Sequence, residues 1–420
     1  MQTQTDSLKN MELAVFRSNP NYGVVILEQL PPQIKQSFLH LGIDQNHHAI
    51  LYPLYSFQLD LKSICKNTAL LFYSLQQPSL LPSSLKQMFG ANFPETIAKM
   101  VLDGILELQN NGSFISGTAA YPLLYEHAFE QQFEEIMEKN SDSLIPRLSM
   151  EALQYADSLE GIDHNALISR MYFYNRIPNS PEWKKIYSST DSVLKTIGLV
   201  EGDSFQSRFE QKWSSHKQKP IQSGWLSFSA KKKLTSQPEN QSKFKLYISP
   251  IPNPHLIREV FQATTDVLGE LEVQNFKIGQ DVTGLLRPDK MVAYFSNFED
   301  CEEAALRILE KISGTPAHGV PFTADFSNDG LLSWGMDPPT TNTLPWGRSS
   351  WRLWIVSQLA ISLMEAKLYR ATNVKPWKYA LDRMQSIGID PSTWAPPHHL
   401  FTNTLPGGID HGISRSVNFA

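Results

Sequence analysis

The chain has 420 residues, a net charge of −5, 41% hydrophobic residues and 11% aromatic residues. This length exceeds that of one compact domain and the apolar content excludes wholesale disorder, so we expect two or three globular domains. The small negative charge argues against a dedicated nucleic-acid binder. Two cysteines, Cys65 and Cys301, are too few for a disulfide framework or a zinc cluster. With no signal-peptide pattern and no run near the roughly 18 apolar residues of a membrane helix, we expect a cytoplasmic protein that makes no membrane contact.

The first 120 residues predict a winged-helix-like module. Residues 1–45 give little signal and are expected to form a leader arm or a first helix. After them, "NTALLFYSLQQ", "PSSLKQMFG" and "FPETIAKMVLDG" predict three helices, with Pro or Gly at their boundaries. The next segment, "ILELQNNGSFISG", has two alternating runs around Asn-Asn-Gly, which predicts a β-hairpin. Three helices followed by a hairpin is the winged-helix order.

The charge of this module decides between its possible ligands. Residues 50–117 carry four lysines against four carboxylates, and the third helix has Lys99 as its lysine. A protein that reads a DNA groove must neutralise phosphates with Lys and Arg, so DNA binding is disfavoured. Binding of a peptide as an added strand at the wing edge fits better, and a purely structural module is the alternative.

The middle of the chain predicts helices and then a polar segment. Residues 121–200 show apolar residues at helical spacing in "YEHAFEQQFEEIMEK", "IPRLSMEALQYADSLEG", "HNALISRMYFYNRIP" and "PEWKKIYSSTDSVLKTIG". The aromatic run Tyr172–Tyr174 is interpreted as core packing. Residues 201–242 are dominated by Gln, Ser, Lys and Pro, so they are interpreted as a linker or loop. The run Lys231–Lys233 fits a solvated loop, or capture of an anion if it lies near a phosphate site.

Residues 243–420 predict an α+β domain with one sheet. Strands are expected at "KFKLYIS", "VQNFKIG" and "MVAYFS". Helices are expected at "NPHLIREVFQATTDVLGEL", "EDCEEAALRILEKIS" and "WGRSSWRLWIVSQLAISLMEAKLYR". The whole chain is therefore predicted to be α+β, with an N-terminal winged-helix-like module, a helical middle and a C-terminal α+β domain.

Cations and phenols occur along these strands where a fold alone would not need them. Alternation places Lys243, Lys245 and Tyr247 on one face of the first strand, and Lys277 lies between Phe276 and Ile278. Further cations and a phenol follow at Arg287, Lys290, Tyr294, Arg348 and Arg352. Each lysine alone could extend to solvent from an edge strand. Together, cations on a sheet face are costly without an anion, so we expect an anion site, with a helix start adding positive potential.

The order "KLYIS…NFKIG…RPDKMVAYF…VPFT…WGRSSWRL" resembles the Hop-type effector family. That family is related to the phosphothreonine lyases of bacterial effectors and to the stand-alone lyases of class V lanthipeptide and thioamitide biosynthesis. The resemblance covers residues 242–366, under a third of the chain. The N-terminal module separately looks like the leader-recognition modules of peptide-modifying enzymes.

The resemblance implies elimination of phosphate from phosphoserine or phosphothreonine in a ribosomally made precursor peptide. The products would be dehydroalanine or dehydrobutyrine. By similarity Lys277 would be the general base, with Lys245 and Tyr247 as the cation and the general acid of the first strand. Arg287 and Tyr294 would hold the phosphate and organise the base. No nucleotide loop is present, so a partner kinase is implied, and no cofactor is implied.

The acid–base chemistry of these residues agrees with this expectation. A neutral amine can take an α-proton if neighbouring cations depress its pKa, and the same cations stabilise the leaving phosphate. Arg348, Arg352 and Lys243 are the further candidates for binding the phosphate, with Arg348 and Arg352 four apart on one helix face.

Some positions depart from the family pattern. The late Gly-x-x-Arg is here Gly347-Arg348-Ser349-Ser350, and the basic residue expected two positions after Tyr294 is Ser296. The related effectors have a histidine acid where Tyr247 falls. These departures keep open a non-catalytic peptide-binding partner of a kinase or another modifying enzyme. His318, His398 and His399 lack the spacing of a metal site, and no Gly-x-Ser-x-Gly supports a serine hydrolase.

Overall fold

The computed structural model describes residues 14–33, 48–55, 61–82, 93–124, 143–216, 224–232, 244–338, 350–369 and 375–396. The chain divides into two compact units. Unit 1 comprises Met1–Glu138, Pro339–Arg348 and Gln358–Gly388, and unit 2 comprises Lys139–Pro338, Ser349–Ser357 and Ile389–Ala420. No helix among the described residues combines the length and the apolar content that crossing a membrane requires.

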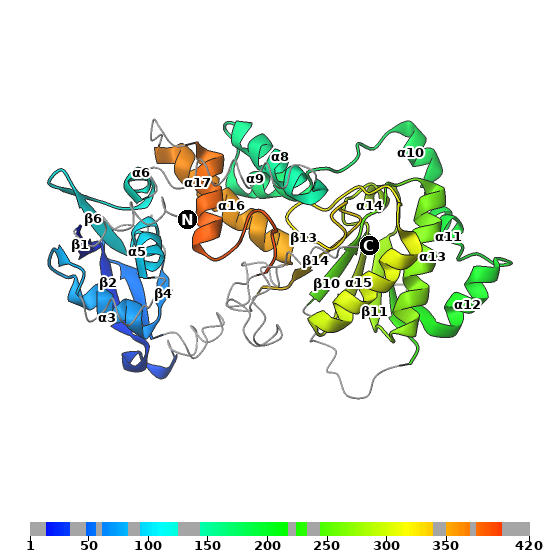
Figure 1. Ribbon diagram of the computed structural model, residues 1–420, viewed down its shortest axis with the longest axis horizontal. Coiled ribbons are helices and arrows are strands. Elements are labelled where there is room, and N and C mark those ends of the chain that lie inside the picture. The colour runs from blue at the N-terminus through cyan, green and yellow to red at the C-terminus, as the bar shows by residue number, and fades with distance from the viewer. Residues whose placement is uncertain are drawn as a thin grey trace. The chain divides into compact units, whose positions relative to one another are not determined.

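Unit 1 contains two small antiparallel sheets and several helices (Figure 1). One sheet has the order β5-β1-β6-β7 and the other the order β2-β3-β4. The strands are β1 (Val15–Ser18), β2 (Tyr22–Ile26), β3 (Ala49–Pro53), β4 (Lys62–Ile64), β5 (Ser79–Leu80), β6 (Leu106–Asn110) and β7 (Ser113–Ile115). The helices are α3 (Lys66–Ser74), α5 (Phe93–Leu102), α6 (Tyr121–Leu124), α17 (Pro376–Ser386) and the second part of α16 (Trp351–Tyr369), with 3-10 turns at Leu27–Gln29 and Gly117–Ala119.

The predicted hairpin is confirmed in unit 1. β6 and β7 pair antiparallel, with Asn110 opposite Ser113. Asn111 and Gly112 both have positive φ, 48° and 84°, as the two central residues of a type I′ turn require. The predicted helices at α3 and α5 are also confirmed, whereas the predicted helix "PSSLKQMFG" lies outside the described residues. The winged-helix assignment stays a prediction.

The expectation of an arm or helix within residues 1–45 is wrong for Val15–Ser18 and Tyr22–Ile26. These residues form the strands β1 and β2. The physical reason is alternation in β1, where Phe16 and Ser18 are buried and their neighbours are half-exposed. Phe16 is the register partner of Leu108, so β1 lies in the sheet core beside the hairpin.

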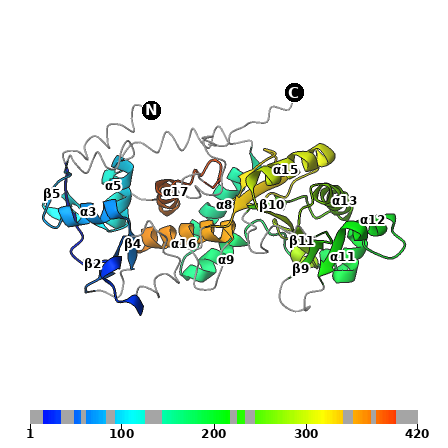
Figure 2. The ribbon, with the colours of Figure 1, turned by 90° about the horizontal axis from the view of Figure 1, so that it is seen from below.

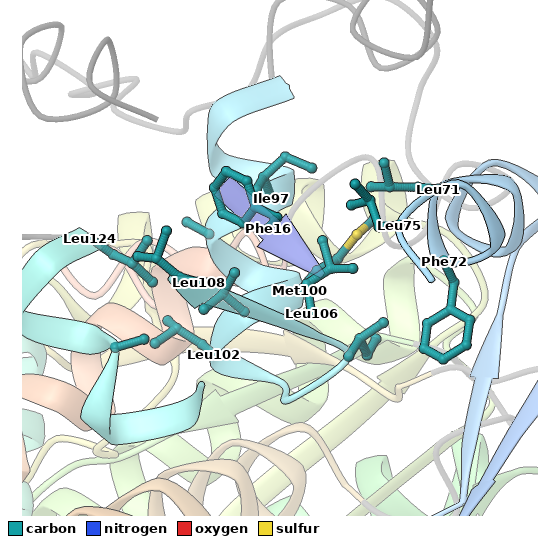
Figure 3. Close-up of a cluster of buried hydrophobic side chains, with 14 of the residues drawn as sticks. Phe16, Leu71, Phe72, Leu75, Ile97, Met100, Leu102, Leu106, Leu108 and Leu124 are labelled. Atoms are coloured by element: carbon teal, nitrogen blue, oxygen red, sulfur yellow. The ribbon is translucent and has the colours of Figure 1, made fainter. Parts of the chain in front are cut away.

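A buried apolar cluster holds unit 1 together. Figure 3 shows Phe16 of β1 close to Ile97 of α5, with Leu106 and Leu108 of β6 nearby. Leu71 of α3 belongs to the same cluster and is fully buried. Residues far apart in sequence therefore share one hydrophobic core.

Unit 2 is built on a seven-stranded antiparallel sheet with the order β13-β14-β10-β12-β11-β9-β8. Its strands are β8 (Trp213–His216), β9 (Trp225–Ala230), β10 (Phe244–Ile248), β11 (Asn275–Gly279), β12 (Met291–Phe295), β13 (Ala324–Asp325) and β14 (Leu332–Met336). Its helices are α8 (Leu144–Ser158), α9 (His164–Tyr172), α10 (Pro181–Ile186), α11 (Thr190–Ile197), α12 (Ser204–Lys212), α13 (Pro254–Glu270), α14 (Val282–Leu285), α15 (Phe298–Ile312) and the first part of α16. Helix and sheet together confirm the α+β class.

Sequence patterns place most elements of unit 2 correctly. The predicted strands correspond to β10, β11 and β12, and the predicted helices to α13 and α15. Asn253 begins α13 by accepting hydrogen bonds from the backbone N–H groups of His255 and Leu256. In the helical middle, the segment "PEWKKIYSSTDSVLKTIG" forms two helices, α10 and α11, where one was expected. Ser189 causes the break because its hydroxyl caps α11 in a capping box with Ser192.

One face of the sheet is apolar and covered by helices. α13 and α15 pack against each other, and α15 contacts β10 and β12 (Figures 1 and 2). Phe276 of β11 is central to the aromatic packing, with ring centroids 4.7 Å from Trp213 and 5.0 Å from Phe228. Phe209 of α12 lies 5.2 Å from Phe228. This buried face leaves the opposite face of the sheet for polar side chains.

The interpretation of residues 201–242 as a linker or loop is wrong for the described residues. They form α12, β8 and β9, and β9 pairs with β11 inside the sheet. Asp203 caps α12 through the backbone N–H of Phe205, and Phe205 and Phe209 bury one helix face. Polar residues dominate the composition, but four aromatic residues are buried in the core, namely Phe205, Phe209, Trp213 and Phe228.

Candidate functional site

Four of the predicted cations and phenols lie on the face of the sheet opposite α13 and α15, namely Lys245, Tyr247, Lys277 and Tyr294. Lys245 and Tyr247 share a face of β10, as predicted from their parity. Lys245 is the register partner of Tyr294 on β12, and Lys277 on β11 is the partner of Val292, two residues before Tyr294. The three central strands therefore bring four of the predicted catalytic residues onto one face.

Lys277 is held by aromatic rings. Its Nζ lies 4.2 Å from the ring centroid of Trp225 and 5.5 Å from that of Tyr294. Burial, followed by repulsion from Lys245 and Arg287, lowers the pKa of Lys277 to about 8. Among the described residues Lys277 makes no ion pair. The amine is therefore mostly protonated at pH 7, but its neutral fraction is far larger than that of an ordinary lysine.

Arg287 reaches this face because the chain turns sharply after β11. The turn depends on two glycines: a Cβ added at Gly279 would lie 2.3 Å from the carbonyl carbon of Gly284. Arg287 follows α14 and places its guanidinium carbon 4.7 Å from the ring centroid of Trp225. Its Nε and Nη2 donate to the carboxylate of Asp289 at 2.8 and 2.9 Å, a bidentate pair. The carboxylate orients the guanidinium.

Arg352, from the first turn of α16, is also paired with Asp289, with Nη1 3.1 Å from Oδ2. Its Nε donates to the Pro321 carbonyl at 3.0 Å and its Nη2 to the Tyr172 carbonyl at 2.9 Å. Only 1% of its side chain is exposed. Burial opposes the ionisation of Asp289, but Arg352 and Arg287 still hold its pKa well below the usual range. We assign Arg352 to holding Asp289, and its predicted contact with phosphate stays a prediction.

Lys245 has a carboxylate partner that the sequence did not indicate. Its Nζ forms an ion pair with Asp337, just after β14, and lies 5.9 Å from the ring centroid of Tyr294. The side chains of Lys245 and Asp337 are 13% and 26% exposed, so the pair borders solvent. Beside it, Gly335 lies against the indole of Trp351, to which an added Cβ would approach within 2.8 Å.

The phenols on this face stay protonated at neutral pH. Burial raises the pKa of Tyr247 and of Tyr294, and nearby carboxylates raise both further. Tyr172, at the end of α9, lies with its ring 4.7 Å from the guanidinium carbon of Arg352. A phenol in this state keeps its proton and can donate a hydrogen bond, but it is a weaker acid than an ordinary tyrosine. The general-acid role of Tyr247 stays a prediction.

Lys290 and His318 form a separate buried pair. Lys290 Nζ lies 2.8 Å from His318 Nδ1, and His318 Nε2 lies 2.7 Å from the backbone oxygen of Asn175. Burial lowers the pKa of Lys290 to about 7 and that of His318 to about 3. His318 is therefore neutral and committed to internal hydrogen bonds. It does not replace Tyr247 as an acid.

Two predicted phosphate-binding residues, Lys243 and Arg348, lie outside the described residues, as do Lys233, Gly347, His398 and His399. Of the lysine run, Lys232 is described and pairs with Glu272. Within the described part of the chain, no group of three or more His, Cys, Asp or Glu side chains could hold a metal ion.

Sequence reasoning missed Trp225, Asp337 and Tyr172. Trp225 lies in a segment whose composition predicts a linker, although "WLSFSA" alternates as a strand does. The aromatic run that contains Tyr172 predicts core packing, and no sequence signal connects Tyr172 with Arg352, 180 residues later. Asp337 follows β14, a strand that was not predicted.

No family model matches the chain, and no curated protein matches it. Among solved structures, it is similar to an effector protein from Pseudomonas syringae pv. tomato at 12% identity, with a TM-score of 0.40. That match covers 60% of this chain and 97% of the other. An effector protein from Pseudomonas syringae pv. syringae matches at 11% identity and a TM-score of 0.35, covering 59% and 95%. Likenesses at this level of similarity carry no argument about the family or the function of this chain.

Proposed function

We propose that unit 2 is a lyase that eliminates phosphate from phosphoserine or phosphothreonine in a peptide. The observation that carries the proposal is Lys277. It is a lysine on a sheet face with a pKa lowered to about 8, beside the further cations Lys245 and Arg287. A general base for neutral pH needs this lowered pKa, and a phosphate dianion needs neighbouring positive charge.

In the proposed reaction, the neutral amine of Lys277 removes the α-proton of the phosphorylated residue. The electron pair left on the α-carbon forms the double bond to the β-carbon, and the bond from the β-carbon to the phosphate oxygen breaks. The Tyr247 phenol donates a proton to the departing phosphate, while Lys245 and Arg287 stabilise its charge. The products are a dehydroamino acid and inorganic phosphate. The Lys277 ammonium then gives its proton to water and the Tyr247 phenolate takes one from water, so both groups return to their starting states.

The substrate is proposed to be a precursor peptide that a partner kinase phosphorylates. Such a partner is needed because no nucleotide loop occurs in the sequence. In unit 1, recognition of an unmodified part of the same peptide is the role we propose for the N-terminal module. Its hairpin β6–β7 has β7 at the edge of the sheet order, where a peptide strand can add.

The alternative is a non-catalytic protein that binds phosphopeptide for a kinase or another modifying enzyme. The observation that favours it is the presence of Ser296 and Ser350 where the related lyases carry basic residues. A site with fewer cations can bind phosphate and still stabilise the elimination transition state too weakly.

Mass spectrometry of a phosphothreonine peptide incubated with the protein tests the proposal. We expect the wild type to release phosphoric acid from the peptide and Lys277→Ala to leave it unchanged. Lys184→Ala, which removes an exposed lysine of α10, is the matched control and should retain activity. An unchanged peptide retained by the wild type would support the binding protein and exclude the lyase under these conditions.

A further inference from the structure

Trp225 contacts two cations of the site at once. Lys277 Nζ lies 4.2 Å from its ring centroid, and the Arg287 guanidinium carbon lies 4.7 Å from the same centroid. Both distances are within the roughly 6 Å range of a cation–π interaction, for which Trp is the best ring. The indole is thus a shared contact of the proposed base and a proposed phosphate ligand.

The backbone around Trp225 fixes its position. Trp225 is the register partner of Gly279, at the end of the strand that carries Lys277. The preceding Gly224 has a φ of +65° and accepts a hydrogen bond from the backbone N–H of Gln280 at 3.2 Å. A Cβ added at Gly284 would lie 3.1 Å from the Gly224 oxygen. Gly224 is therefore packed against the turn that delivers Arg287.

The packing of the ring also restricts it. The indole is half-buried and packs against the cluster of Tyr247, Val292 and Val320 on the polar face of the sheet. A ring held on one side by this cluster and by its strand has little freedom to leave the cations. Its position is set by the fold and needs no bound substrate.

The three cations of the site are held in two different ways. Lys245 is paired with Asp337 and Arg287 with Asp289, whereas Lys277 makes no ion pair among the described residues. A carboxylate beside Lys277 would hold the amine but would also raise its pKa and keep it protonated. An aromatic ring attracts the ammonium through its quadrupole and carries no counter-charge.

We propose that Trp225 is a positioning residue that holds Lys277 and Arg287 in place without neutralising either charge. The inference that this serves a base rests on the proposed function, but the holding of the two cations does not. Removal of the ring should loosen both groups, and a carboxylate in its place should fix Lys277 as an ammonium ion.

In the described part of the chain, the charged groups that face Lys277 are Lys245 of β10, Arg287 and Asp289 between α14 and β12, and Asp337 after β14. The substitutions at Trp225 remove none of these charged groups. A change in the titration of Lys277 therefore comes from the group at position 225 or from the release of Lys277 and Arg287 that its loss causes.

The experiment compares Trp225→Phe, Trp225→Leu and Trp225→Glu in the full chain. Acetic anhydride labelling at a series of pH values, followed by peptide mapping, gives the labelling midpoint of Lys277. Calorimetry with inorganic phosphate gives the affinity of the site. Trp183→Leu, in the same unit, is the control, because its ring stacks on Tyr187 at 6.0 Å and contacts neither cation.

We expect a midpoint near that of the wild type for Trp225→Phe, a lower one for Trp225→Leu and one at least about one pH unit higher for Trp225→Glu. Phosphate affinity should fall about threefold to tenfold in Trp225→Leu, within the range of a cation–π contact. Shifts in opposite directions would not come from loosened packing alone. Unchanged midpoints in the Leu and Glu variants would overturn the proposal.

Two further outcomes have defined meanings. If circular dichroism shows that Trp225→Glu does not fold, the comparison of Phe with Leu decides, and equal midpoints in those two variants overturn the proposal. If the wild type eliminates no phosphate but the midpoints shift as expected, the positioning role stands and the lyase function fails. If the wild type eliminates phosphate but the labelling midpoints of Lys277 do not shift in the variants, the lyase function stands and the positioning role of Trp225 fails.

Discussion

Arg352 Nη1 lies 3.1 Å from Asp289 Oδ2, and this ion pair joins the first turn of α16 to the segment before β12. Asp289 also binds Arg287 in a bidentate manner. One buried carboxylate therefore orients a guanidinium of the candidate site and fixes the start of a long helix. This relationship makes Asp289 a point where the stability of unit 2 and the geometry of the site are coupled.

We expect Asp289→Asn to lower the free energy of unfolding of unit 2 by about 3–5 kcal/mol, because it leaves the buried Arg352 without its counter-charge. Urea denaturation measures this loss. Glu310→Gln, an exposed carboxylate of α15, is the control and should change stability by less than about 0.5 kcal/mol. A loss below about 1 kcal/mol in Asp289→Asn would show that water or another acceptor replaces the carboxylate.

The pH dependence of elimination should follow Lys277. Because its pKa is lowered to about 8, the fraction of neutral amine and hence kcat/KM should rise as pH increases through about 8. Measurement between about pH 7 and 9.5 keeps the substrate phosphate, with a second pKa near about 6, in its dianionic form. Lys277→Arg should be inactive throughout, because a guanidinium stays protonated. A rate that falls across this range would exclude a lysine base.

The core behind the site gives a prediction about stability. Phe276 is 1% exposed and its ring lies 4.7 Å from Trp213 and 5.0 Å from Phe228, on the strand that presents Lys277 to the other face. Phe276→Ala should cost about 3–5 kcal/mol, through lost burial and the cavity that it leaves. Phe173→Ala, at a residue that is 44% exposed, should cost far less. Thermal unfolding of both variants checks the difference, and equal losses would contradict this packing.

The sequence predicted the elements that follow strong local patterns. The strands and helices from β10 to α15 alternate or repeat clearly, and the parity of Lys245 and Tyr247 is enough to place them on one face. The hairpin β6–β7 was predictable because Asn111 and Gly112 satisfy a turn that few other residues can adopt.

The remaining features depend on distant contacts. Trp225 joins the site because β9 pairs with β11 across an intervening helix and strand, and composition alone suggested a linker there. Asp289 and Arg352 lie far apart in the sequence, and no local pattern pairs them. The tertiary fold determines which charged groups pair in the interior. The cations of the site could therefore be predicted from the sequence, but the carboxylates that orient them could not.

Asp325 at the end of β13 gives a prediction on pH and stability. Burial, with a further contribution from Asp329, raises its pKa to about 7, and its Oδ2 has no hydrogen-bond partner among the described residues. The folded state therefore binds more protons than the unfolded state between about pH 4 and pH 7. The stabilisation is complete below about pH 4 and is lost as pH rises through about 7.

Asp325→Asn should remove this dependence because an amide does not titrate in this range. The amide oxygen can still accept a hydrogen bond from the backbone N–H of Ser327, as Asp325 does at 3.0 Å. Urea midpoints at pH 5 and pH 8 should converge in the variant, with the gain at pH 8, and a variant less stable than the wild type at pH 8 would show that the ionised carboxylate is favoured in the fold.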